Sequence, residues 1–302
     1  VTVAANWLAT AWDQNAVMEV TSPVAAALED VASRWLLEIL GLPRESAVGF
    51  VGCDTVATFS GLAAARRALL LREGWDVDAE GLFGAPPITV VVSEETHVAV
   101  HKALGLLGLG RERVIRVSVD GQGRMRADKL PPFERCTIVC VQAGNVNTGS
   151  FDPAGEICAR AHAAGAWVHV DGAFGIWAAA APPLAHLARG IPDADSWSFD
   201  GHKWLNVPYD SGVVVVRHAS HLREAMSGDA AYLQRGNKRD PGFLTPGMSM
   251  RARGVEVWAA LASLGRAGVA DLIERTCRHA TRFAEGLRVG CPQPGAGFVR
   301  KR

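Results

Sequence analysis

A lysine and an aspartate between residues 167 and 212 have the side-chain types and the surroundings that covalent chemistry needs. Asp171 ends a strand-like run that begins at Trp167, and Lys203 follows a second such run at residues 195–199. Lysine is rarely buried without a purpose, and desolvation lowers the pKa of its amine and makes it a nucleophile toward aldehydes. An amine and a carboxylate, each just past a buried strand, favour a site for an aldehyde cofactor with a basic ring nitrogen.

Two histidines and a turn of small residues extend this candidate site. His97 follows a predicted strand at residues 88–92, and His202 directly precedes Lys203. The turn at residues 49–55, GFVGCDT, leads into a predicted helix, and free backbone N–H groups at a helix N-terminus can bind phosphate. Because ligands bind at the carboxyl ends of strands in a parallel sheet, one crevice could hold all of these groups.

Each of these residues also has a purely structural interpretation. A lone lysine at a strand end usually belongs to a solvated surface, and an aspartate after a strand usually caps a turn or a helix. His97 could cap a helix and His202 could be a polar core residue. A helix capped by Asp54 or Thr55 explains the turn as well as a phosphate site does. The combination of these groups in one crevice favours the chemical interpretation.

Short apolar strands separated by helices predict the scaffold. This alternation is typical of an α/β fold with a mostly parallel central sheet and helices on both faces. The expected strands lie at residues 88–92, 113–119, 137–142, 167–171, 195–199 and 213–216. The expected helices lie at residues 23–40, 56–72, 97–108, 156–165 and 251–287. In the first of these helices, apolar residues recur at helical spacing at Val24, Leu28, Val31, Trp35 and Ile39.

Composition excludes several classes of protein. The 302 residues carry 31 basic and 31 acidic side chains, so the chain has no net field for nucleic acid or an anionic membrane. No apolar run reaches the length of a membrane span without interruption. None of the six cysteines has a metal-ligand spacing, which predicts reduced thiols, a cytoplasmic protein and no metal site. The N-terminus has no signal-like segment, and we expect the chain to start inside a longer reading frame.

The motifs around Asp171 and Lys203 resemble those of the pyridoxal-phosphate-dependent group II amino-acid decarboxylases, which include the aromatic-amino-acid and glutamate decarboxylases. HVDGAFG and SFDGHKW carry the resemblance most specifically, and it extends from Trp7 to about Leu287. Further similar segments are NWLATAWDQN, FSGLAAARRALL, SEETHVAVHKA, AGNVNTGSFDP and RARGVEVWAALASLG.

The resemblance implies a role for each matching residue. Lys203 would form the internal aldimine with pyridoxal 5'-phosphate, and Asp171 would bind its pyridine nitrogen. Ala173 would pack on one face of the ring, and His97 would stack on the other. His202 would contact the phosphate or relay a proton. The remaining cofactor-binding positions would be Thr55 in the phosphate turn and Asn145 in the segment that lines the pocket.

The resemblance also implies the fold and the assembly. The fold would be the type I fold of PLP-dependent transferases, with a large α/β domain at residues 1–250. Residues 251–302 would be a linking helix and the truncated start of a small C-terminal domain. The active site would lie between the two subunits of a homodimer.

The expected reaction is decarboxylation of an L-amino acid, with an aromatic one favoured, to the amine and carbon dioxide. Two alternatives stay open: an aldehyde-forming or other lyase relative with the same cofactor, and a truncated, non-catalytic paralogue. A nucleotide-binding protein is disfavoured because neither G-x-G-x-x-G nor a P-loop follows any strand.

Three departures from the family pattern stand out. Asp54 falls where the family usually has Gly or Ala, and a carboxylate facing a phosphate dianion would be repelled by about 1 kcal/mol or more. Many relatives carry a proton-donating tyrosine in the long polar loop at 227–250, and Phe243 and Leu244 lie near its expected position. The two tyrosines of the chain, at 209 and 232, do not match that position clearly, and no small C-terminal domain follows.

Overall fold

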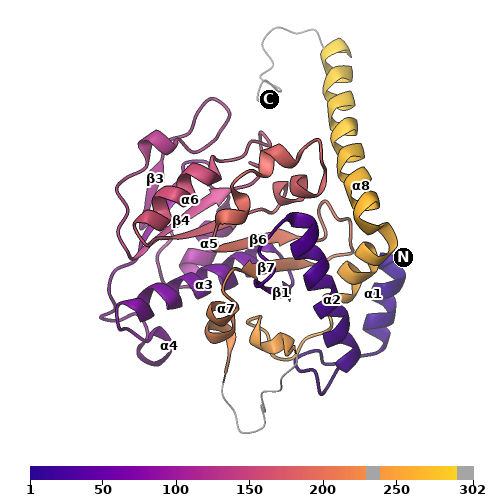
Figure 1. Ribbon diagram of the computed structural model, residues 1–302, viewed down its shortest axis with the longest axis horizontal. Helices are drawn as coiled ribbons and strands as arrows, with labels where there is room; N and C mark the ends of the chain where they lie inside the picture. Colours follow the sequence, from indigo (N-terminus) through magenta and orange to yellow (C-terminus); the bar gives the residue numbers. More distant parts are fainter. Residues whose placement is uncertain (229–238, 291–302) are drawn as a thin grey trace.

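A seven-stranded sheet forms the centre of the computed structural model, which describes residues 1–228 and 239–290 (Figure 1). The strand order is β1-β7-β6-β5-β4-β2-β3. The strands are β1 (Ala47–Val51), β2 (Thr89–Ser93), β3 (Val114–Val117), β4 (Thr137–Gln142), β5 (Trp167–Asp171), β6 (Ser196–Asp200) and β7 (Gly212–Val216).

The sheet is mostly parallel, as predicted. Strand β7 runs antiparallel to both of its neighbours, β1 and β6, whereas every other neighbouring pair is parallel. Six strands therefore point their carboxyl ends toward the same edge, which is where a ligand site is expected.

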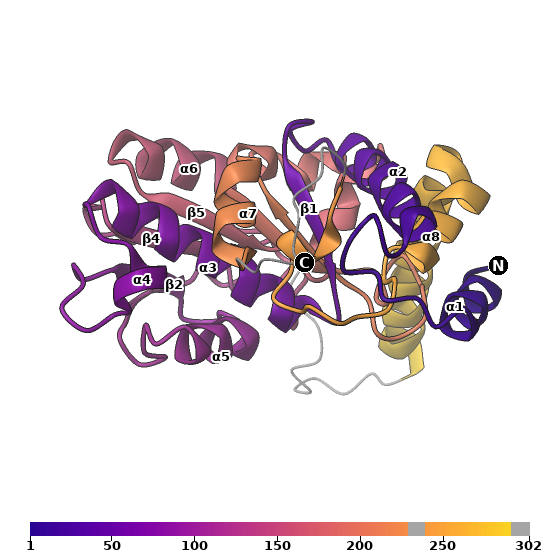
Figure 2. The ribbon, with the colours of Figure 1, turned by 90° about the horizontal axis from the view of Figure 1, so that it is seen from below.

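Helices cover both faces of the sheet (Figure 2). They are α1 (Thr2–Ala11), α2 (Pro23–Leu40), α3 (Asp54–Arg72), α4 (Val77–Glu80), α5 (Val98–Leu106), α6 (Ala154–Ala163), α7 (Ala219–Met226) and α8 (Val255–Gly290). Short 3-10 helices lie at Ala127–Lys129, Gly175–Ala180, Ala185–Ala188, Ile191–Asp193 and Pro241–Phe243. Helices α3, α5 and α7 contribute to the core on one face, and α2, α6 and α8 to the core on the other.

Successive side chains of each central strand pack alternately into the cores on the two faces of the sheet. In β7, Val213 and Val215 pack on the side of α2, whereas Val214 and Val216 pack on the side of α3. Successive side chains of a strand point to opposite faces, so a strand buried on both sides is mainly apolar, and its buried polar residues, such as His169 and Ser198, are hydrogen-bonded. This explains why the strands read as continuous apolar runs in the sequence.

Three predictions about the elements need correction. Gly49 was expected in a turn, but it lies inside β1, which the prediction missed. The expected single helix after residue 251 is interrupted at Gly265, where φ is 61° and ψ is −179°. In α2, Val24 and Trp35 are exposed, and Leu36, Leu37 and Leu40 are buried instead, so the predicted apolar stripe does not face the core as a whole.

Two predictions from composition can be compared with the structure. Among residues 1–228 and 239–290, no helix combines the length and the apolar character that crossing a bilayer requires. Cys140 and Cys158 are buried free thiols, and burial raises the pKa of each to about 12. These two thiols are therefore unreactive at neutral pH.

Candidate active site

Asp171 is the last residue of β5, and its carboxyl group is buried between the sheet and the loop that follows. Its Oδ1 accepts a hydrogen bond of 3.2 Å from the backbone N–H of Ala173. Burial raises the pKa of Asp171, and that N–H together with the positive charges of His97 and Lys203 opposes the rise. The carboxyl group is therefore placed among cationic partners at the carboxyl end of the sheet.

Lys203 lies three residues after the end of β6 and is held by an ion pair. Its Nζ is 2.8 Å from Oδ2 of Asp200, whose side chain is almost completely buried. The same ammonium lies over the ring of Phe174, 4.4 Å from the ring centroid. These contacts fix the amine near Asp171, whose charge it influences.

The turn before α3 brings Asp54 and Thr55 to the same edge. Gly212 lies so close to this turn that an added Cβ would come within 2.4 Å of the carbonyl carbon of Cys53, which requires glycine there. The backbone N–H of Asp54 donates a 2.7 Å hydrogen bond to Oδ1 of Asp200. The backbone N–H of Thr55, at the second position of α3, has no acceptor in the described part of the chain and can bind an anion.

The carboxyl group of Asp54 points inward. The residue is 5% exposed, and its Oδ1 has no hydrogen-bond partner among the described residues. Burial raises the pKa of Asp54 well above its usual range, and the charges of Asp171 and Asp200 act in the same direction. Asp54 is thus part of a group of three buried acids at one edge of the sheet.

His202 is fixed on three sides. Its Nδ1 accepts a 3.2 Å hydrogen bond from the backbone N–H of Ser211, and its Nε2 is 3.6 Å from Oδ1 of Asp200. Its ring stacks on Tyr209 with 3.9 Å between the centroids. His202 therefore reaches the carboxylate that also pairs with Lys203.

The other two predicted residues lie on loops after strands β2 and β4. His97 caps α5, with Nδ1 accepting from the backbone N–H of Ala99 at 3.3 Å, as its structural interpretation predicts. Its charge nevertheless acts on Asp171, so it also belongs to the site. Asn145 uses its side-chain amide within its own loop and to bind Glu95 at 3.0 Å.

Asp200, Phe174 and Tyr209 are site residues that the sequence prediction missed. Asp200 makes the most contacts with other residues of the site: it binds Lys203, faces His202 and accepts the N–H of Asp54. The signal for it was present, since an acid three residues before the lysine ends a buried strand. The following glycine made that acid look like part of an ordinary turn.

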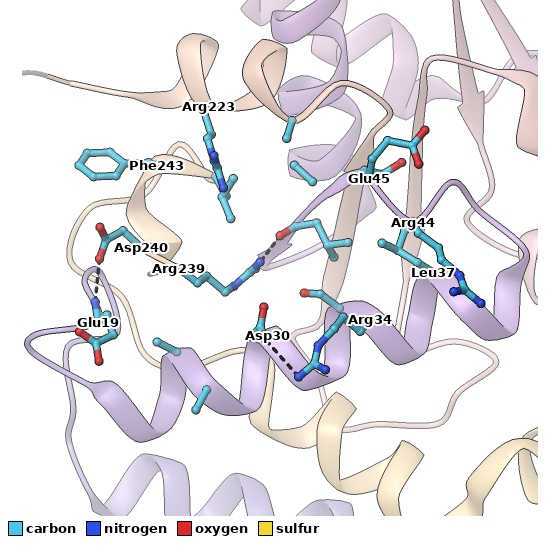
Figure 3. A pocket seen from close by; sticks show the side chains of 18 of the residues that line it. Glu19, Asp30, Arg34, Leu37, Arg44, Glu45, Arg223, Arg239, Asp240 and Phe243 are labelled. Carbon is cyan, nitrogen blue, oxygen red and sulfur yellow. Dashed lines mark hydrogen bonds and ion pairs between the residues drawn. The ribbon is translucent and has the colours of Figure 1, made fainter. Parts of the chain in front are cut away.

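A separate cavity of about 1060 Å³ lies between α2, α7 and the start of β1 (Figure 3). Phe243 and Leu244, which were expected near the position of a loop tyrosine, line this cavity. Lys203 and Asp171 are not among its described lining residues. Phe243 and Leu244 thus lie against this cavity, and Tyr232 lies outside the described residues.

The residues present fit an aldehyde cofactor with a ring nitrogen and a phosphate group. Lys203 supplies an amine, and Asp171 supplies a buried acid that cationic neighbours favour in its ionised form. The unused N–H of Thr55 supplies an anion-binding group at a helix N-terminus. Ala173, which has a small side chain, lies two residues after the acid and donates its backbone N–H to it.

A family model matches residues 1–290 of the chain; it describes the conserved domain of pyridoxal-dependent decarboxylases. The aromatic-L-amino-acid decarboxylase of Bacillus atrophaeus is 27% identical over 300 residues, which cover 94% of this chain and 58% of that protein. The aspartate 1-decarboxylase of Aliivibrio fischeri is 31% identical over 253 residues, 78% of this chain and 46% of that protein. The chain thus spans about half the length of these curated relatives.

Solved structures share the fold. The crystal structure of Oryza sativa TDC with PLP and tryptamine matches with a TM-score of 0.81 and 25% identity, over 89% of this chain and 59% of that one. The crystal structure of mouse CSAD matches with a TM-score of 0.85 and 22% identity, over 95% of this chain and 61% of that one. The predicted type I fold and the predicted family resemblance are both confirmed.

Proposed function

Because the chain belongs to the pyridoxal-dependent decarboxylase family, we propose that it binds pyridoxal 5'-phosphate and removes the carboxyl group of an L-amino acid. The products are the amine and carbon dioxide. The observation that carries this proposal is the pairing of Lys203 with the buried Asp200 close to Asp171, at the carboxyl edge of the sheet. An aromatic amino acid is the favoured substrate, since one of the matched relatives is an aromatic-L-amino-acid decarboxylase.

Bound pyridoxal phosphate supplies an electron sink for the pair left behind when a bond to the α-carbon breaks. Asp171 acts on the ring nitrogen. Its carboxyl group would bind that nitrogen when the cofactor is present, and the N–H of Ala173 together with His97 and Lys203 opposes the rise in the pKa of Asp171 that burial causes. Lys203 is the residue that holds the aldehyde, since its Nζ lies at this edge of the sheet.

The remaining residues position the ligands. Ala173, which follows β5, and His97, which follows β2, would pack on the two faces of the ring. Thr55 and the start of α3 bind the phosphate, with His202 as a further partner. Asn145 shapes the loop beside the pocket. Decarboxylation requires the scissile bond to be held perpendicular to the ring, and rigid neighbours serve that orientation.

The function is tested by reconstituting the protein with pyridoxal phosphate and measuring amine and carbon dioxide release from a panel of amino acids. Lys203→Ala is expected to lose covalent retention of the cofactor and to lower turnover by at least a hundredfold. Lys102→Ala, at an exposed position on α5, is the matched control and should retain both. Full activity in Lys203→Ala would refute the role of the lysine, and release of an aldehyde in place of the amine would favour the aldehyde-forming alternative.

We also propose the organisation of the chain. Residues 1–250 form the large cofactor-binding domain, and residues 251–302 form a linking helix and the start of a smaller domain. The protein is a cytoplasmic homodimer in which both subunits contribute to the site. Exposed apolar residues on α1, among them Trp7 and Leu8, support the dimer because contiguous apolar surface usually marks an interface.

A further inference from the structure

Three acids and few cations meet at the carboxyl edge of the sheet. Asp54, Asp171 and Asp200 are each at most 6% exposed. Lys203 is the cation in direct contact with this group, through Asp200, and His97 acts on Asp171 from α5. Buried carboxylates that lack enough counter-charge cannot all be ionised, because taking an unpaired charge out of water costs several kcal/mol.

Asp54 is the acid with the fewest partners. Asp200 accepts the N–H of Asp54, pairs with Lys203 and faces His202, so both of its oxygens are used. Asp171 has a backbone N–H and two cationic neighbours. Asp54 has a 3.5 Å contact from Thr58 to Oδ2 and nothing on Oδ1 among the described residues, and the hydroxyl of Ser198 and the charge of Lys203 only partly oppose the rise in its pKa. Of the three acids, Asp54 is therefore the one that is expected to be protonated.

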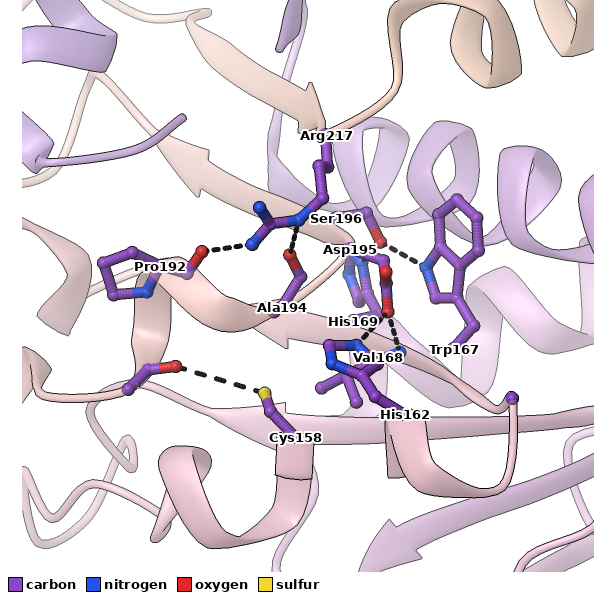
Figure 4. Close-up of polar contacts among 12 residues, drawn as sticks. Cys158, His162, Trp167, Val168, His169, Pro192, Ala194, Asp195, Ser196 and Arg217 are labelled. Carbon is purple, nitrogen blue, oxygen red and sulfur yellow. Dashed lines mark hydrogen bonds and ion pairs between the residues drawn. The ribbon is translucent and has the colours of Figure 1, made fainter. Parts of the chain in front are cut away.

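A buried chain of polar side chains decides which oxygen of Asp54 carries that proton. The chain begins at Trp167, whose indole N–H can only donate and lies 2.9 Å from Oγ of Ser196 (Figure 4). Ser196 contacts Nδ1 of His169 at 2.8 Å, and its hydroxyl hydrogen has no other acceptor in the described part of the chain. Burial lowers the pKa of His169 to about 3, so the neutral ring carries its hydrogen on Nε2.

The chain then continues from His169 to the site. Nε2 of His169 is 3.4 Å from Oγ of Ser198, and Ser198 is 2.9 Å from Oγ1 of Thr58. Each hydroxyl passes its hydrogen to the next acceptor, and Thr58 donates to Oδ2 of Asp54. Because Oδ2 is an acceptor, the proton of a neutral Asp54 lies on Oδ1, the oxygen without a partner.

We propose that Asp54 holds a proton on Oδ1 and that retention of the cofactor depends on this proton, an inference that rests on the proposed function. Asp54 is the first residue of α3, the helix whose N-terminus is assigned to the phosphate. A neutral Asp54 leaves that helix end favourable for a dianion. An ionised Asp54 repels the dianion.

The sign of the pH dependence follows from this repulsion. Bound phosphate stabilises the protonated form of Asp54, so the folded protein holds that proton to a higher pH with cofactor than without it. In the interval between the two titrations the dissociation constant of the cofactor rises by up to about tenfold per pH unit. Below this interval Asp54 is neutral in both states, and its effect disappears.

The experiment compares the wild type with Asp54→Asn. Dissociation constants of pyridoxal phosphate are measured by fluorescence titration between about pH 6 and pH 9. Lys203 and the phosphate titrate in both proteins. Dividing the dissociation constant of the wild type by that of Asp54→Asn at each pH therefore isolates the contribution of Asp54. This ratio is expected to rise with pH by at least tenfold in total, and calorimetry in buffers of different ionisation enthalpy should show proton uptake that Asp54→Asn lacks.

Two further variants sharpen the test. Thr58→Val removes the hydroxyl that donates to Oδ2 of Asp54. Loss of this donor favours the neutral form of Asp54, so the rise of the dissociation constant should begin at a higher pH than in the wild type. Asp195→Asn is the control, because Asp195 binds the N–H of Val168 at the opposite edge of the sheet and should leave the profile unchanged.

The outcomes separate the two proposals. A wild-type profile that coincides with that of Asp54→Asn overturns the inference and leaves the proposed function standing. An equal effect of Asp195→Asn would also overturn the inference, since the pH dependence would then not be specific to Asp54. Absence of pyridoxal phosphate binding in every protein at every pH overturns the proposed function, and this inference with it.

Discussion

Asp200 links two parts of the chain that lie far apart in the sequence. Its carboxylate accepts the N–H of Asp54, 146 residues earlier, and pairs with the ammonium of Lys203 three residues later. One buried side chain thus fixes both the helix end assigned to the phosphate and the amine assigned to the aldehyde. Asp200 therefore orients two groups that are proposed to bind the cofactor.

Asp200→Asn should lower the free energy of unfolding by about 2 kcal/mol, because the buried amide cannot balance the charge of Lys203. Asp210→Asn is the matched control, since Asp210 pairs with Arg251 and Arg253 at a half-exposed position. Exposed ion pairs contribute about 1 kcal/mol or less, so the control should change little. Urea unfolding of both variants makes the comparison, and equal losses would contradict the special role of Asp200.

The chemical residues were easier to predict than their neighbours. Asp171 ends the buried strand β5 and Lys203 follows the buried strand β6, and these positions indicated one crevice. The inward orientation of Asp54 could not be predicted, because it depends on Thr58 and on a strand distant in the sequence. The roles assigned to the site residues stay predictions until they are measured.

Helix α3 packs against β5, β6 and β7, and a glycine allows its close approach to β5. A Cβ added at Gly61 would come within 2.9 Å of Cε1 of His169, whose ring is fully buried and bonded on both sides. The glycine therefore brings the helix near enough for Thr58 to reach Ser198. The position of the start of α3 depends on the same contact.

Gly61→Ala is expected to lower the free energy of unfolding by about 1–3 kcal/mol, because the added methyl group overpacks against His169. Helix propensity alone would make Gly61→Ala more stable than the wild type, so a decrease in the free energy of unfolding shows that overpacking dominates. Gly105→Ala in α5 is the matched control: its added Cβ meets nothing within 4 Å, and the variant should gain up to about 1 kcal/mol. A stabilised Gly61→Ala would show that α3 can shift away from the sheet.

Elements defined by local pattern were predicted well, and elements defined by distant partners were not. Strand β4 was placed at its observed limits from its apolar run alone. Strand β1 was missed because its glycine suggested a turn, and the strand it pairs with, β7, is distant in the sequence. Glycine fits there because Gly49 lies against the backbone of Leu244, a contact that no local pattern records.

Apolar side chains of α1 lie on the surface of the molecule. Trp7 is 71% exposed and Leu8 is 55% exposed, although α1 packs against α8 on its other side. Such a surface is unusual for a monomer and is consistent with the proposed homodimer. The resemblance and this surface support the same assembly by independent arguments.

Sedimentation equilibrium should give the mass of a dimer for the wild type and a lower average mass for Trp7→Glu, because a charge in an apolar interface is costly. Phe83→Glu is the matched control: Phe83 is 98% exposed on a loop away from α1, and its replacement should leave the mass unchanged. A wild type that is monomeric across the concentration range would contradict the homodimer.

The position of β7 between β1 and β6 delays the pairing of β1 while the nascent chain is still on the ribosome. Ala47 pairs with Val216, so β1 must wait for a strand made much later before it can join the sheet. At about 5–20 residues per second, the 146 residues between Asp54 and Asp200 take roughly 7–30 seconds to synthesise. Throughout that interval the turn assigned to the phosphate lacks its hydrogen bond to Asp200, and the edge of β1 that later pairs with β7 is open to chaperones or to other nascent chains.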